Sequence, residues 1–134
     1  MRIKTVFLTM AGVYALNRIF GWAYDVWPNV DIPMHILGGA LAALLGLALW
    51  EWVRDRWNVK GMASAAVMAF MICFAVLIAT LWEFHEFLID WWHVRAGVAH
   101  DILMQPSLAD TMKDEFDGLL GAVIIALVMR KKIK

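Results

Sequence analysis

The sequence has little of what soluble enzymes use for their chemistry. Among its 134 residues are one cysteine and three prolines, so no intrachain disulfide can form. The only serines are Ser64 and Ser107, and neither lies in a Gly-x-Ser-x-Gly turn, which argues against a serine hydrolase. Neither a phosphate-binding loop nor a dinucleotide-binding glycine pattern is present. No basic stripe with interleaved aromatic residues occurs, so we expect no nucleic acid as a partner.

Charge is also scarce, whereas apolar residues are abundant. Charged residues make up 18% of the chain and hydrophobic residues 63%, with a mean hydropathy of +0.68. A soluble domain is about half apolar and a quarter charged. The composition therefore predicts an integral membrane protein whose main partner is the lipid bilayer. At this length we expect a single transmembrane domain over residues 1–134.

Four hydrophobic segments are long enough to cross a bilayer, which takes about 18 or more mostly apolar residues. They cover approximately residues 4–24, 33–53, 61–90 and 107–129. Ser107-x-x-Asp110 follows Gln105-Pro106 and has the form of a capping box that begins the fourth helix. The predicted fold class is therefore all-α, an integral membrane four-helix bundle.

Lysine and arginine residues predict how this bundle is oriented. One predicted side carries nine of them: Arg2, Lys4, Arg54, Arg56, Lys60, Arg130, Lys131, Lys132 and Lys134. The other side has only Arg95 and, near the start of the fourth segment, Lys113. Because basic residues concentrate on the cytoplasmic side, both termini are predicted to be cytoplasmic. The expected location is the cell (inner) membrane, in a multi-pass arrangement.

Several acidic residues fall at depths where a charge is expensive. At about 1.5 Å per residue from Arg130, Asp117 lies roughly 20 Å and Asp114 roughly 24 Å into a hydrocarbon core of about 30 Å. A charge near the bilayer centre costs about 2.5–3.5 kcal/mol on insertion scales. Asp114 and Asp117 should therefore face the bundle interior and find partners there.

The polar residues also share helix faces, at about 100° per residue. The stripes are Glu83, Glu86 and Asp90 on the third segment, Asp110, Asp114, Asp117 and Gly121 on the fourth, and His35, Gly38, Gly39, Ala42 and Gly46 on the second. His85 and Glu115 lie off these stripes. We expect the three stripes to meet in the outer third of the bilayer, where the small residues of the second segment permit close helix contact.

Alternative explanations of this acidic cluster remain open at this point. In one, Arg18 neutralises Asp114 or Asp117 and the other acids are interfacial. In another, the carboxylates share protons. In the third, the surplus of carboxylates binds a divalent metal cation. Its expected ligands are His35, Glu83, Glu86, Asp110, Asp114 and Asp117. With the histidine, the metal would be zinc, manganese or iron, and without it magnesium or calcium fits equally.

Three functions follow from these alternatives. A metal site near the extracytoplasmic face predicts a metal-dependent hydrolase or transferase acting on a lipid or lipid-linked substrate, with Glu86 or Asp90 as general base. Intramembrane acids with a histidine also fit a cation- or proton-binding transport or sensing module. The third alternative is a structural membrane scaffold. A homo-oligomer is compatible with each of them.

The motifs also resemble those of known membrane proteins. His35-x-x-Gly38-Gly39, Glu83-x-x-Glu86 and Asp110-Thr111-x-x-Asp114, followed by Gly121-Ala122, resemble the YjdF-like small bacterial membrane proteins and, more distantly, the VanZ-like family. The likeness runs from the second segment to the C-terminus, but Asp117-Gly118 replaces an asparagine common in those families. The resemblance implies a multi-helix membrane protein. VanZ-like members are associated with glycopeptide antibiotic resistance, and no settled reaction accompanies either family.

Overall fold

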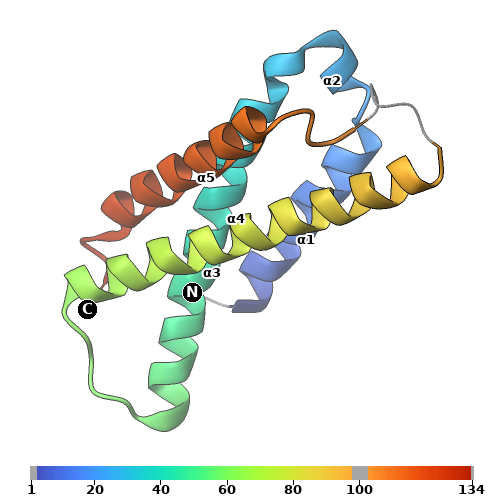
Figure 1. The fold of residues 1–134 in the computed structure, drawn as a ribbon. Helices are drawn as coiled ribbons and strands as arrows, with labels where there is room; N and C mark the ends of the chain where they lie inside the picture. Colours follow the sequence, from blue (N-terminus) through green and yellow to red (C-terminus); the bar gives the residue numbers. More distant parts are fainter. Residues whose placement is uncertain (1–2, 98–102, 134) are drawn as a thin grey trace.

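The computed structural model of the chain describes residues 3–97 and 103–133, and all regular structure within them is helical. The elements are α1 (Ile3–Ile19), α2 (Ala23–Val26), the 3-10 helix η1 (Pro28–Val30), α3 (Asp31–Trp57), α4 (Ser64–Arg95) and α5 (Leu108–Met129) (Figure 1). The expected all-α class with four long helices is thereby confirmed. By length and composition, α3 and α4 are the described helices that could cross a membrane.

The ends of α3 and α5 follow from local sequence. Ser107 precedes α5, and its hydroxyl oxygen accepts a hydrogen bond from the Asp110 N–H at 3.2 Å, as the capping sequence predicts. At the end of α3, Asn58 adopts a left-handed conformation with φ of 50°. Asparagine tolerates that conformation better than most residues, so the helix stops there.

The first long helix ends before the predicted first span does. The apolar run continues to Tyr24, but α1 ends at Ile19 and the chain turns before α2 begins. Gly21 lies in this turn, where its weak helix propensity is no disadvantage. Conversely, α3 begins two residues before the predicted Pro33, at Asp31, whose negative charge favours a helix N-terminus.

The central helix of the bundle is α3, which contacts α1, α4 and α5. Figure 1 shows α4 crossing α3 obliquely, while α5 lies against both. Between α3 and α5 the backbones touch: a Cβ atom at Gly39 would overlap the Gly118 carbonyl, and one at Gly121 would overlap the Ile36 carbonyl. Glycine is therefore required where these two helices meet, as in close helix pairs of membrane proteins.

The interior of the bundle is built from small or slender apolar side chains, whereas bulky ones face outward. The buried apolar cluster includes Ala42, Ala43, Leu47, Val67, Met71, Ala75, Ala122 and Ala126. On the outer face of α4, Leu77, Phe84 and Leu88 are each more than half exposed. Soluble monomers rarely leave such a continuous apolar surface uncovered, so this distribution is typical of helices that face lipid.

Candidate functional site

Buried carboxylates gather at the end of the bundle where α3 and α5 begin and α4 ends. They are Glu83, Glu86, Asp90, Asp114 and Asp117. All five belong to the acidic stripes predicted from helical periodicity, and their inward orientation is confirmed. His85, which lies off the stripe, is exposed. Because a buried charge is costly without partners, the contacts of each carboxylate determine what this end of the bundle can do.

The centre of the cluster is formed by Asp31 and His35 of α3 and Asp114 of α5. His35 Nε2 lies 3.2 Å from Asp31 Oδ1 and 3.8 Å from Asp114 Oδ2. One possible ligand atom from each residue lies within 4.8 Å of the other two. An imidazole with two carboxylates is a donor set suited to zinc, manganese or iron.

Sequence reasoning missed Asp31, because the second span was expected to begin at Pro33. The observed helix places Asp31 one turn before His35, on the same face. The i, i+4 spacing of Asp31 and His35 was visible in the sequence and could have identified the pair.

Lys113 is the basic residue that enters the cluster. Its Nζ lies 3.1 Å from Asp31 Oδ2 and 4.0 Å from Asp117 Oδ2, and it also contacts Asp114 Oδ1. One of the sequence-based alternatives paired these acids with Arg18, but that residue is exposed on α1, which packs mainly on α3. In the described part of the chain, the ion pairs of Asp114 and Asp117 are made with Lys113 and His35.

Glu86 lies beside this centre and has an aromatic neighbour on its own helix. Its Oε1 accepts a hydrogen bond from Trp82 Nε1 at 2.8 Å. The Trp82 ring in turn packs edge-on against Tyr14 of α1, with centroids 5.6 Å apart. Glu86 interacts electrostatically with His35 and Asp114. It does not belong to the compact group of Asp31, His35 and Asp114, called the ligand group below. Glu86 thus borders the site and is not one of its closest possible donors.

Glu83 and Asp90 hold the segment that precedes α5. Gln105 Nε2 donates to Glu83 Oε2 at 2.6 Å and to the Glu83 carbonyl at 3.0 Å. The two Asp90 oxygens accept the backbone N–H groups of Met104 at 2.9 Å and Gln105 at 2.8 Å. This geometry gives Asp90 a structural role in anchoring the loop, and its predicted role as general base remains a prediction.

The remaining predicted ligands, Asp110 and Asp117, differ in their surroundings. Asp110 is half-buried in the first turn of α5 and lies outside the compact group. The Asp117 side chain is 10% exposed, and its Oδ2 has no hydrogen-bond partner among the described residues. An unsatisfied buried oxygen is uncommon and costs stability, and a water molecule or an ion would satisfy it.

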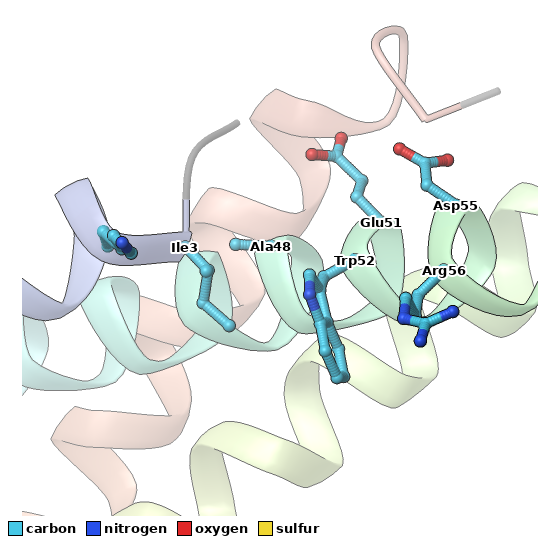
Figure 2. Close-up of a pocket in the computed structure, with 7 residues that line it drawn as sticks. Ile3, Ala48, Glu51, Trp52, Asp55 and Arg56 are labelled. Carbon is cyan, nitrogen blue, oxygen red and sulfur yellow. The ribbon is translucent and has the colours of Figure 1, made fainter.

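A different pocket, of about 540 Å³, lies at the opposite end of the bundle. It is lined by Ile3, Lys4, Ala48, Glu51, Trp52, Asp55 and Arg56. Figure 2 shows the Glu51 and Asp55 carboxylates on one side of α3 and the Arg56 side chain on the other. Asp55 is paired with Arg54, whose Nε lies 3.0 Å from Asp55 Oδ1. Its lining has both signs of charge and a tryptophan. Such residues are typical of the membrane–water interface rather than of a metal site.

In comparison with known proteins, a family model described as "Predicted membrane protein (DUF2238)" matches residues 3–133, which include all four long helices. The YjdF-like resemblance is consistent with it, while the VanZ-like relation stays a prediction. No curated protein and no solved structure matches the chain.

Proposed function

Because the chain belongs to the DUF2238 family of predicted membrane proteins, we propose that it is a four-span membrane protein that binds a divalent cation near the extracytoplasmic face. Membership of the family and the two long apolar helices support the membrane assignment. The basic residues support the orientation, because those at the ends of α3 and α5 lie opposite the acidic cluster.

The observation that carries the proposal is the convergence of Asp31, His35 and Asp114 from two helices. Glu86 and Asp117 add buried carboxyl groups around this group. Against these acids, Lys113 supplies one certain positive charge, with a second only when His35 is protonated. A divalent cation would balance the surplus, and the imidazole favours zinc or manganese over calcium.

We further propose that the site serves a hydrolase or transferase for a lipid or lipid-linked substrate. A cation bound there would polarise a phosphoryl or acyl oxygen, or activate a water molecule. Glu86 would act as the general base, since it is buried beside the ligand group and a hydrogen bond from Trp82 fixes its carboxyl group. The proposed depth of the site, near the lipid headgroups, suits an amphiphilic substrate.

Transport has less support from the fold. A cation pathway needs polar groups on both sides of a binding site. Directly beneath the cluster, α3 and α5 touch at Gly39 and Gly121, and the interior beyond consists of the small apolar cluster. A route for a hydrated ion through one copy of this bundle would have to cross that packed layer.

Cation binding is tested on the purified full-length protein in detergent. We expect Mn²⁺ or Zn²⁺ to bind in isothermal titration, and Asp114→Asn to weaken binding at least about tenfold because a ligand oxygen is lost. Glu115→Gln is the matched control, since this adjacent residue accepts its hydrogen bond from Thr80. Wild-type affinity in Asp114→Asn, or no binding by the wild type, would contradict the proposal.

A further inference from the structure

We propose that Lys113 is a built-in competitor for the cation, so that its ammonium group and the cation occupy the site alternately. This inference rests on the proposed cation site and adds a means of regulating it. It is carried by the way in which the lysine shares the carboxylates of the ligand group.

Lys113 and His35 bridge the same two carboxylates. Asp31 offers Oδ1 to His35 and Oδ2 to Lys113, and Asp114 offers Oδ2 to His35 and Oδ1 to Lys113. A cation coordinated by Asp31, Asp114 and His35 would bind the same two carboxylates whose other oxygens contact the ammonium group. Because both are positively charged and would lie within a few ångströms of each other, their simultaneous binding is strongly disfavoured.

Asp117 indicates independently that the lysine does not satisfy all the carboxylates around it. Its side chain is nine-tenths buried and directed at the same ammonium group, yet Oδ2 remains 4.0 Å from Lys113 Nζ without a hydrogen bond. The ammonium group is held closely by Asp31 and Asp114 and leaves one oxygen of Asp117 without a hydrogen bond. A cation that drew in Asp117 would satisfy this oxygen.

The lysine can leave without moving the helices. Its side chain is 40% exposed, compared with 4% for Asp114 and 15% for His35. Lysine side chains are long and flexible and readily carry their charged end to the membrane surface. Lys113 therefore has an exit that the ligand residues lack.

The first test compares cation affinities of the full-length protein by titration with Mn²⁺ and Zn²⁺. Lys113→Gln removes the competing charge, so we expect binding about 5- to 150-fold tighter than in the wild type, the usual range for coupled sites. Lys113→Arg keeps the charge and is the matched control, so we expect it to bind the cation with about the wild-type affinity. Asp114→Asn should weaken binding in either background.

The second test uses the wild-type protein and does not depend on a variant folding. Reaction of lysines with an acylating reagent, followed by mass spectrometry, reports how accessible each amino group is. Saturating Mn²⁺ should increase the labelling of Lys113, because its amino group is released from the carboxylates. Lys60, exposed at the opposite end, is the internal reference and should not change.

The outcomes separate this inference from the cation site itself. If the wild type binds the cation but Lys113→Gln binds no more tightly, or Lys113 labelling is unchanged at saturation, competition is refuted and the cation site stands. Absence of binding in both proteins would overturn both proposals. Binding by Lys113→Gln alone would show that the lysine blocks the site permanently, which refutes both alternate occupancy and cation binding by the wild type.

Discussion

At the residue scale, the buried carboxylates differ in what satisfies them. Asp90 receives two backbone N–H groups, and Glu83 receives a side-chain amide. Asp31 and Asp114 share Lys113 and His35, while Asp117 keeps one oxygen without a hydrogen bond. A fully satisfied carboxylate stabilises the fold, whereas one with exchangeable or missing partners can accept a ligand. By this criterion Glu83 and Asp90 of α4 are structural acids, whereas the proposed ligand acids lie on α3 and α5 and Glu86 of α4 keeps its proposed role as general base.

Asp90→Asn tests this division. One acceptor oxygen becomes an amide donor that faces a backbone N–H, so we expect a loss of about 1–3 kcal/mol in stability with cation affinity unchanged. Thermal unfolding in detergent measures the first, and limited proteolysis should show faster cleavage near Gln105. His85→Gln, an exposed position on the same helix, is the control. Unchanged stability together with lost cation binding would instead assign Asp90 to the site.

Helical periodicity was sufficient to identify the inward-facing acids, but not their partners. The angle of a residue around a helix gives the direction of its Cβ, which for Asp114 and Asp117 nearly fixes where the carboxylate lies. Lys113 has a long flexible side chain, so its ammonium group reaches a face that its Cβ does not indicate. Its role, unlike that of Asp114, therefore depends on the three-dimensional arrangement.

At the element scale, the α3–α5 contact sets the geometry of the site, because each helix contributes part of the ligand group. Gly39→Ala places a methyl group against the Gly118 carbonyl. We expect about 1–3 kcal/mol of destabilisation from this overlap. Since relief requires the helices to separate, cation affinity should fall as well. Thermal unfolding and titration on the same preparation measure the two effects.

Gly38→Ala is the control for this prediction. A Cβ atom there meets nothing within 4 Å, so the substitution keeps the helix contact and gains helix propensity. Neutral or slightly increased stability is expected, with unchanged cation binding. Equal effects of the two alanines would show that the close approach of α3 and α5 does not hold the site together.

The sequence was informative about helices and less so about their ends. Ser107 and Asp110 marked the beginning of α5 because a cap is encoded locally. The end of α1 was missed because the apolar run continues through the turn, and hydrophobicity alone does not report backbone direction. The oblique crossing of α4 over α3 (Figure 1) likewise arises from packing between distant segments.

At the scale of the whole molecule, the two ends of the bundle have opposite character. Basic residues and the pocket of Figure 2 lie where α3 ends, and buried acids lie where it begins. Between them is a closely packed apolar layer. If the basic end is cytoplasmic, the proposed cation and substrate would reach the acidic site from the opposite side. Orientation therefore determines which compartment the site serves.

This orientation predicts the accessibility of single cysteines placed at the two ends. Cys73 on α4 is first replaced by alanine, and then Ala96→Cys or Gly61→Cys is introduced at an exposed position. In intact cells, a membrane-impermeant maleimide should label Ala96→Cys, next to the acidic site, and should reach Gly61→Cys only after permeabilisation. The reverse pattern would show that the site faces the cytoplasm. The orientation predicted from the basic residues would then be wrong, and an extracytoplasmic lipid-linked substrate would be excluded.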